Sequence, residues 1–475
     1  MTTMRTRVNF RRTTVPLCAV LLHAACCAQT FCAGPTFSIA VCADGQLQGW
    51  GLNNGAPGVH HLGNAILGSD SSAGLPVWLN PIFSFNNIKA VAAGDHHVLA
   101  LLNDGHVYGW GGNGSYQLGT GGTANSDHPV QVQGLADVLA ISASATSSLA
   151  LKSDGTVWQW GTLMITRELP EQVPGIDSVI KIASGNGMHM ALRSDSTVWT
   201  WGTGPGVAHY DGLDTPIPGP VYHYWDDIIY YLGGIKDIAT SNGCCFAMRW
   251  DGYVEAWGNN LNGNLGLDIT WESVLSPITI PAGETQNTCG TYLCGVRAIA
   301  STNGSTLAVM EDGTLWKWAY DPVPFSFYPT ATAMPVPWHA VAVAAGFDHF
   351  LVLDDTGELW SLGSNEFGQL GTAEGLSGVP PMPVASLCTM TGMNEEVSNQ
   401  LNVYPNPTSE YITLTIPSYN LGQYEIHGPT GQLVRSGPMH SGSTTVDVRD
   451  LPYGLYSIHY QGQGQSALVA RFIKE

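Results

Sequence analysis

The sequence has little charge, and most of that charge is negative. Only 11% of its 475 residues are charged, and 17 basic residues stand against 37 acidic ones. Affinity for nucleic acid depends on neutralising phosphates with Lys and Arg, so a chain this acidic is unsuited to DNA or RNA. After the first 30 residues no run approaches the ~20 apolar residues of a membrane-spanning helix. We therefore predict no nucleic-acid partner and no transmembrane span in the mature chain.

Motifs of catalysis and metal binding are equally scarce. The sequence contains no G-x-S-x-G, no H-E-x-x-H and no phosphate-binding glycine loop, the patterns that mark common hydrolases, metalloproteases and nucleotide-binding proteins. A structural zinc site needs four suitably spaced ligands, and no C-x-x-C or H-x-x-H pair supplies them. We predict a protein that is not an enzyme and that needs no cofactor and no metal.

The first 28 residues are predicted to be a secretory signal peptide. Four arginines and no acidic residue occupy the first twelve positions, an apolar run follows at 15–25, and small residues precede the end of the segment. This is the layout of a leader that is cleaved between Ala28 and Gln29. Cleavage would leave 13 basic residues against 37 acidic ones, a net charge of −24. The mature protein is therefore expected outside the cytoplasm.

Seven cysteines follow the leader: Cys32, Cys42, Cys244, Cys245, Cys289, Cys294 and Cys388. Disulfides persist outside the cytoplasm. We predict a local disulfide between Cys289 and Cys294, which frame "CGTYLC" in a long loop. An odd total leaves at least one thiol unpaired.

The chain repeats one short pattern seven times. The copies are "DGQLQGWG" at 44–51, "DGHVYGWG" at 104–111, "DGTVWQWG" at 154–161, "DSTVWTWG" at 195–202, "DGYVEAWG" at 251–258, "DGTLWKWA" at 312–319 and "TGELWSLG" at 356–363. An apolar run such as "VLALL" precedes the pattern, so a unit has two strands joined at Asp-Gly. Asp-Gly favours positive φ at both central positions of a type I′ turn, which predicts a two-residue hairpin loop.

The tryptophans of the repeat also indicate strands. Trp158 and Trp160 are two residues apart, two other copies repeat this spacing, and residues two apart lie on the same face of a strand. One hairpin cannot bury its apolar faces alone, whereas stacked copies can. Seven β units spaced 41 to 61 residues apart predict an all-β, seven-bladed propeller with the tryptophans packed between neighbouring sheets.

The unit resembles the regulator-of-chromosome-condensation repeat. That repeat runs from an apolar-Ala-x-Gly start through "AL…DG-x-V-x-x-WG" to "N-x-x-G-Q-L-G", and the second copy matches it nearly throughout, from Gly94 to Val132. The resemblance covers about 31–388 and implies a seven-bladed propeller at 29–388 that acts as a platform for binding. We expect "PMPVASLC" at 381–388 to add a strand to the first unit and seal the ring, where Cys388 could pair with Cys32 or Cys42.

Residues 401–475 are predicted to form a separate module after a linker at 389–400. Short alternating runs such as "YITLTI" and "LYSIHY", separated by Pro, Gly and Asn, predict a small Ig-like antiparallel β-sandwich. "NVYPNP", "GPTGQLV", "LPYGLY" and a basic end resemble the C-terminal sorting domain of the type IX secretion system of Bacteroidetes. The motif residues are Tyr404, Pro405, Asn406, Pro407, Leu451, Pro452, Gly454, Tyr456 and Lys474. The resemblance implies export by the type IX machinery, removal of this domain, and a protein that is secreted or attached to the outer surface.

Repeated acids and histidines are interpreted as structural. The hairpin aspartates, from Asp44 to Asp312, stand at turns and suit turn formation. His97 and His349 occupy the same repeat position and His189 is offset by one residue, which favours hydrogen bonding within the fold over catalysis. The carboxylate pair of a glycosidase can come together only in three dimensions. Its candidates, in the insertion after the fourth copy, are Asp211, Asp214, Asp226 and Asp227.

The insertion "VYHYWDDIIYYLGG" at 221–234 is the candidate partner-binding segment. Its crowded ring side chains are Tyr222, His223, Tyr224, Trp225, Tyr230 and Tyr231. Tyr and Trp give a large contact area at small entropic cost; the alternative is that these rings cover their own blades. Two classes of function remain open. One is a secreted, non-catalytic protein that binds an unknown protein or glycan through propeller loops; the other is a secreted polysaccharide- or protein-degrading enzyme with acidic residues at the propeller mouth.

Overall fold

A computed structural model describes residues 30–42, 45–53, 72–79, 87–207, 214–225, 228–241, 243–267, 272–281, 288–289, 292–321, 326–372, 378–385, 387, 402–404, 411–415, 422–428, 432–439, 443–462 and 468–474. The predicted leader with its Ala28–Gln29 cleavage site, and the predicted linker at 389–400, lie outside these ranges. The chain divides into two compact units, 1–391 and 392–475. In the described ranges, no helix is long and apolar enough to cross a membrane.

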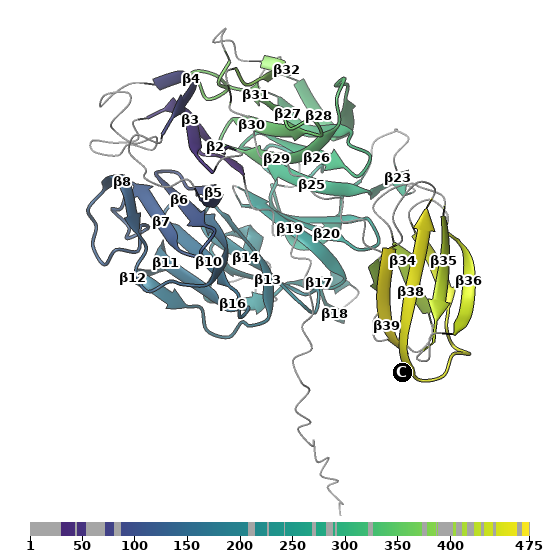
Figure 1. Cartoon of the computed structure of the whole chain (residues 1–475). Helices are drawn as coiled ribbons and strands as arrows, with labels where there is room; N and C mark the ends of the chain where they lie inside the picture. Colours follow the sequence, from purple (N-terminus) through teal and green to yellow (C-terminus); the bar gives the residue numbers. More distant parts are fainter. Residues whose placement is uncertain are drawn as a thin grey trace, which may run out of the picture. The chain divides into compact units, whose positions relative to one another are not determined.

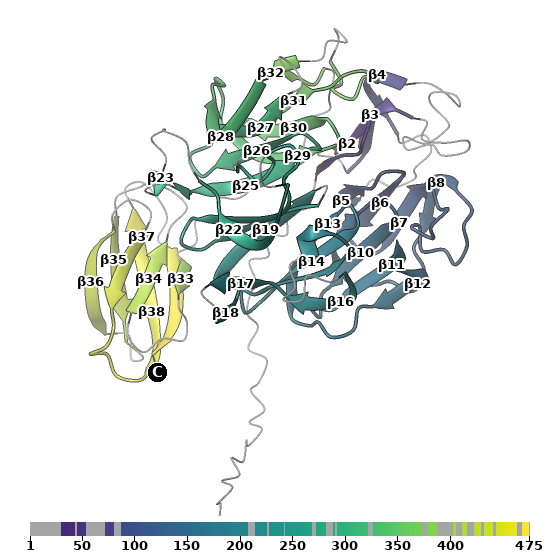
Figure 2. The same ribbon diagram turned by 180° about the vertical axis from the view of Figure 1, so that it is seen from behind.

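The first unit is an all-β, seven-bladed propeller (Figures 1 and 2). Its described residues form seven four-stranded antiparallel sheets, and each sheet takes its strands from one continuous stretch of chain. In blade order the strands are β1 (Phe31–Ala33), β2 (Phe37–Val41), β3 (Leu47–Leu52) and β4 (Ser72–Trp78); β5 (Ile88–Ala93), β6 (His97–Leu102), β7 (Val107–Gly111) and β8 (Ser126–Gln131); β9 (Val138–Ala143), β10 (Ser147–Lys152), β11 (Val157–Leu163) and β12 (Ile165–Gln172); β13 (Val179–Gly185), β14 (Met188–Arg193), β15 (Val198–Gly202) and β16 (Thr215–Pro220); β19 (Ile235–Ser241), β20 (Cys244–Arg249), β21 (Val254–Asn259) and β22 (Ser273–Thr279); β25 (Val296–Ser301), β26 (Ser305–Met310), β27 (Leu315–Asp321) and β28 (Ser326–Met334); β29 (Ala340–Ala345), β30 (His349–Asp354), β31 (Leu359–Gly363) and β32 (Gly378–Pro383).

Three short elements lie outside the blades. The 3-10 helix η1 (Pro205–Val207) follows β15. A hairpin of β17 (Tyr222–Trp225) and β18 (Ile228–Tyr231) connects the fourth blade to the fifth. A second hairpin, of β23 (Thr288–Cys289) and β24 (Tyr292–Leu293), connects the fifth blade to the sixth.

The ring closes without exchanging a strand. The first strand of each blade contacts the first strand of the next, and β29 contacts β1. The expectation that 381–388 adds a strand to the first blade is wrong, because β32 pairs with β31 of its own blade. The first blade already has four strands, since residues 31–33 supply its innermost one.

Buried tryptophans join neighbouring blades. Trp160 donates its indole N–H to the carbonyl of Gln117 in the preceding blade at 2.8 Å, and Trp318 bonds the carbonyl of Asn264 in the same way at 2.7 Å. Trp50 bonds the carbonyl of Gln369 at 2.9 Å, which fastens the first blade to the seventh. These side chains are fully buried, so the prediction that the tryptophan stripe packs between sheets is confirmed.

The Asp-Gly segments form a different turn from the one predicted. In the second blade the N–H of Gly105 bonds the carbonyl of Leu102 at 3.0 Å, and the N–H of Leu102 bonds the carbonyl of His106 at 2.9 Å. Positive φ falls on Gly105 (83°) and not on Asp104. This is a three-residue loop, a turn followed by a glycine bulge, so the type I′ prediction is wrong. Asp104 accepts the N–H of His106 at 3.1 Å, which confirms that the aspartates form turns.

The cysteines agree in part with the predicted pairing. Cys294 is disulfide-bonded, and the side chain of Cys289, its predicted partner, lies outside the described residues. Cys42 is also disulfide-bonded, whereas Cys32 is a buried free thiol, so the alternative pairing of Cys32 is wrong. Cys244 and Cys245 are buried free thiols as well. Burial raises the pKa of Cys244 to about 12, which makes it a packing residue and not a nucleophile.

The second unit contains two antiparallel sheets that share one apolar core. The core includes Ile412 and Val446 from one sheet and Ile426, Tyr456 and Ile458 from the other. The three-stranded sheet consists of β33 (Asn402–Tyr404), β34 (Tyr411–Thr415) and β37 (Ser443–Asp447); the four-stranded sheet consists of β36 (Leu433–Met439), β35 (Gly422–His427), β38 (Gly454–Gly462) and β39 (Leu468–Lys474).

Candidate partner-binding site

The repeated histidines join blades. His97 lies 2.8 Å from Ser148 Oγ in the next blade, and His349 lies 2.9 Å from Ser38 Oγ across the closing seam. His189 lies 3.1 Å from Ser147 Oγ in the preceding blade. Because His189 stands one position later in the repeat, the histidine and the serine of this pair have exchanged blades. All three histidines are fully buried. Their interpretation as structural hydrogen-bonding residues is confirmed.

Burial keeps two of these histidines neutral. Desolvation lowers the pKa of His349 to about 3, and desolvation together with the charge of Arg167 lowers the pKa of His189 to about 3. A general base that works near neutral pH needs a pKa near that pH and access to the substrate. These two imidazoles have neither.

Of the four aspartates that are candidates for an enzymatic site, the structure describes one. Asp214 is exposed and accepts the N–H of Gly204 at 2.7 Å, which closes the loop after β15. The other three, Asp211, Asp226 and Asp227, lie outside the described residues.

The predicted aromatic insertion forms the β17–β18 hairpin. Its backbone register pairs Tyr222 with Tyr231, His223 with Tyr230, Tyr224 with Ile229 and Trp225 with Ile228. The rings of Tyr222 and Tyr231 lie 5.1 Å apart at 35°, and Tyr231 is 64% exposed. The structure describes the backbone but not the side chains of His223, Tyr224, Trp225 and Tyr230. The end of the hairpin nearest the blades therefore presents an exposed phenol to solvent.

Trp250 is a second exposed aromatic residue, and its backbone is bonded to the segment that follows this hairpin. It stands between Arg249 and Asp251 at the turn of the fifth blade and is 57% exposed. Its backbone N–H donates to the backbone carbonyl of Gly234 at 2.9 Å, and this bond joins the turn to the segment that follows β18. This residue is not among those predicted from the sequence, because partner-binding residues were expected in the insertions and Trp250 lies inside a repeat copy.

The other copies carry small or polar residues at the position of Trp250. Five of them make the same backbone bond to the preceding connection; for example, the N–H of Ser194 donates to the carbonyl of Ser178 at 2.8 Å. The turn therefore needs the bond but not the indole. Comparison of the seven copies would have found this residue. Its counterparts are Ala43, Asn103, Ser153, Ser194, Glu311 and Asp355.

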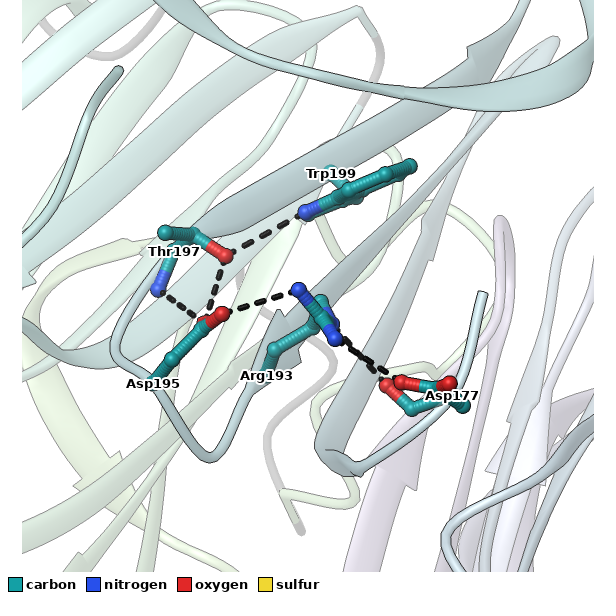
Figure 3. Close-up of polar contacts among 5 residues, drawn as sticks. All are labelled: Asp177, Arg193, Asp195, Thr197 and Trp199. Carbon is teal, nitrogen blue, oxygen red and sulfur yellow. Dashed lines mark hydrogen bonds and ion pairs between the residues drawn. The ribbon is translucent and has the colours of Figure 1, made fainter. Parts of the chain in front are cut away.

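The fourth blade has a covered indole close to the corresponding turn (Figure 3). Arg193 donates to Asp177 and to Asp195, each at 2.8 Å, and its guanidinium carbon lies 5.4 Å from the ring centre of Trp199. Trp199 donates to Thr197 at 3.2 Å, and Thr197 donates to Asp195 at 2.6 Å. The indole of this blade lies on the sheet, next to a cation.

The fifth blade places its residues differently. Buried Glu255 stands where the fourth blade has Trp199, since both pair with the alanine in the middle of the second strand. Arg249 binds Asp251 at 2.7 Å and lies 3.6 Å from Glu255. The exposed tryptophan of the fifth blade, Trp250, is instead at the tip of the turn, where the residue is 57% exposed.

The next connection adds a third exposed ring. Tyr253, three residues after Trp250, meets Tyr292 edge to face, with 6.2 Å between ring centres and an interplanar angle of 81°. Tyr292 begins β24 and is 44% exposed. A backbone bridge joins Tyr253 to Cys294, whose disulfide-bonded state restrains this connection.

We name Tyr222, Tyr231, Trp250, Tyr253 and Tyr292 the aromatic patch. Burial and the neighbouring ring of Tyr231 raise the pKa of Tyr222, so its phenol remains a neutral hydrogen-bonding group. Burial acts to raise the pKa of Asp251, but the hydrogen bonds and charge of Arg249 lower it below its ordinary value. The aromatic patch is therefore uncharged, and the ion pair of Arg249 with Asp251 flanks Trp250.

Comparison with known families identifies both units. The regulator of chromosome condensation (RCC1) repeat model matches residues 104–151, and a second model of that repeat matches 88–117 and 340–369. The secretion system C-terminal sorting domain model matches 402–475. The chain is a propeller of RCC1 repeats that ends in a type IX sorting domain. This domain implies contact with the secretion machinery, and secretion or surface attachment of the protein.

Known relatives are similar in sequence to this chain over part of their length. The Ultraviolet-B receptor UVR8 of Arabidopsis thaliana is 29% identical over 299 residues, which are 60% of this chain and 55% of that protein. RUG3, a mitochondrial RCC1 domain-containing protein of the same plant, is 32% identical over 27% of either chain. This chain thus spans about half or less of the length of these relatives.

Solved structures of other proteins confirm the fold. Prp20p of Saccharomyces cerevisiae superposes with a TM-score of 0.60 at 20% identity, over 79% of this chain and 90% of that one. Human WBSCR16 gives a TM-score of 0.58 at 19% identity, over 67% of this chain and 85% of that one. At these identities the likeness concerns the propeller fold alone.

Proposed function

We propose that the protein is a non-catalytic, secreted or surface-attached binding protein, and that its aromatic patch contacts a protein or glycan partner. The observation that carries the proposal is the exposure of Trp250, Tyr231 and Tyr292 on three neighbouring segments of a rigid scaffold. Large rings on a rigid support bury much area on binding and lose little entropy.

The repeat supports a role in binding over a role in folding. A residue that a turn requires is expected in most of the copies, whereas Trp250 occurs in one of the seven. Water contact with an indole is unfavourable by about 25 cal/mol per Å² of apolar area, and a partner would remove that contact.

The test is a binding measurement on the mature chain. A glycan array and a pull-down identify ligands, and calorimetry then gives the Kd of each for the wild-type protein and Trp250→Ala. Loss of a central aromatic contact is expected to weaken binding roughly 30-fold, which corresponds to about 2 kcal/mol.

Leu261→Ala is the matched control. Leu261 is 60% exposed in the loop after the third strand of the same blade, at the opposite end of the sheet from Trp250, and it is expected to leave the Kd unchanged. Equal weakening by both variants, or turnover of an arrayed glycan or peptide in place of binding, would contradict the proposal.

A further inference from the structure

Three positions of the sorting motif "LPYGLY" at 451–456 are buried or have an unusual backbone conformation. Leu451 and Tyr456 are buried in the core of the second unit. The Tyr456 hydroxyl donates to the carbonyl of Pro452 at 2.7 Å, which closes the segment back on itself. Gly454 has a φ of 157°. These residues hold the chain in shape where it enters β38, and no partner can reach the two buried side chains.

Tyr453, in the middle of the same motif, points in the opposite sense. It is 82% exposed, the highest value among the large hydrophobic side chains that the structure describes. Its ring is absent from the buried core of the unit. The fold of the second unit therefore gains little from this ring.

Lys474, in the last strand of the second unit, lies beside Tyr453. The register of β38 and β39 pairs Gly454 with Lys474, and the ammonium of Lys474 lies 5.3 Å from the ring centre of Tyr453. The side chain of Lys474 is itself largely buried. Two parts of the sorting signal that are 20 residues apart in the sequence thus meet at one edge of the sheet. A cation at this distance from the ring attracts it and favours this orientation.

We propose that Tyr453, oriented by Lys474, is the side chain that the secretion machinery binds, and that Leu451, Gly454 and Tyr456 form the support that presents it. The partner is a protein of that machinery with a recess that accepts one aromatic ring. The inference concerns the second unit and goes beyond the function proposed for the propeller.

The export of the full chain from a bacterium with a type IX system tests this assignment. Tyr453→Ser is expected to lower the amount outside the cells at least tenfold, with the protein retained inside. Tyr411→Ser is the matched control, because Tyr411 is a 39% exposed tyrosine of the same unit that also lies next to a cation, Arg449, at 4.9 Å. The control is expected to be exported within twofold of wild type. Export of Tyr453→Ser at the wild-type level would overturn the proposal.

Two further variants separate recognition from folding. Tyr453→Phe keeps the ring and is expected to be exported normally, whereas Tyr453→Leu keeps apolar bulk without a ring and is expected to be retained. Limited proteolysis should show all three Tyr453 variants with a second unit as resistant as wild type. Equal export of the Phe and Leu variants would contradict the need for a ring. Ligand binding by the propeller is a separate measurement, so failure here leaves the function proposed above unaffected.

Discussion

Ala319 has a left-handed backbone conformation, with φ 78°, at the position where the other six copies have glycine. At the equivalent Gly161 an added Cβ would lie 2.5 Å from the carbonyl oxygen of Thr146. A residue with a side chain is strained in this conformation and in this space. Ala319→Gly is therefore expected to raise the free energy of unfolding by about 1 kcal/mol, as measured by urea denaturation.

Gly161→Ala is the reverse experiment in the third blade. It introduces the same strain and should lower the free energy of unfolding by more than about 1 kcal/mol. A loss of stability in Ala319→Gly would show that the sixth blade has adapted to its alanine.

The seam histidines predict acid sensitivity. His189 and His349 each have a pKa of about 3 in the folded protein, below the ordinary value of about 6.5. The unfolded chain therefore binds more protons between these two values, and stability falls as the pH drops through this window. Each histidine contributes a slope of about 1.4 kcal/mol per pH unit.

His349→Gln tests this linkage. The variant is expected to be less stable than wild type at pH 7, but its stability should fall less steeply from pH 6 to pH 4, by about 1.4 kcal/mol per unit. Urea unfolding at several pH values measures both slopes. An unchanged slope in His349→Gln would contradict the assignment.

At the scale of the blade, five of the seams contain a buried hydrogen bond from an indole N–H to the preceding blade. Where a blade has a "QLG" or "NLG" segment, the backbone carbonyl of its Gln or Asn accepts the indole N–H of the tryptophan in the next blade. The third blade lacks that segment, and the side-chain oxygen of Gln159 accepts Trp201 at 3.0 Å. In the fourth blade the carbonyl of Gly206 in η1 accepts Trp257 at 2.9 Å. The residue that accepts the bond differs between blades, but each of these buried indoles has an acceptor, because a buried N–H without a hydrogen-bond partner lowers stability.

Trp257→Phe removes one such bond and leaves the carbonyl of Gly206 without its donor. The free energy of unfolding is expected to fall by about 2 kcal/mol. Trp250→Phe makes the same chemical change at an exposed indole of the same blade and should alter stability by less than about 0.5 kcal/mol. Equal losses in both variants would contradict the seam argument.

At the scale of the whole propeller, ring closure joins residues from the two ends of the unit. Ser38 and His349 are 311 residues apart and form a buried hydrogen bond. In a closed ring their effects on stability must couple. A double-mutant cycle of Ser38→Ala and His349→Gln is expected to give a coupling energy of about 1 kcal/mol. A coupling energy of zero would indicate that this seam is open in solution.

The repeat and the sorting module could be predicted because both depend on local pattern. The period of two between Trp158 and Trp160 reflects strand geometry, and seven copies leave few ways to bury their faces. Asp-Gly is compatible with both two-residue and three-residue hairpin loops. The bond from the N–H of Leu102 to the carbonyl of His106 shows that the three-residue loop forms. Strand exchange at the closing seam was predicted wrongly because pairing depends on contacts between distant segments: residues 31–33 supply the innermost strand of the first blade, and β32 completes its own blade.

The sequence by itself determined the number of blades, their strands and the buried tryptophans, since neighbouring residues carry that information. Tertiary structure alone decided which aromatic side chains remain in water. Trp250 and Tyr292 are 42 positions apart, and they lie on neighbouring segments because the turn of the fifth blade is bonded to the next connection. Likewise, Lys474 meets Tyr453 only through the pairing of β38 with β39. Exposure and proximity are relations between distant segments, and packing creates them.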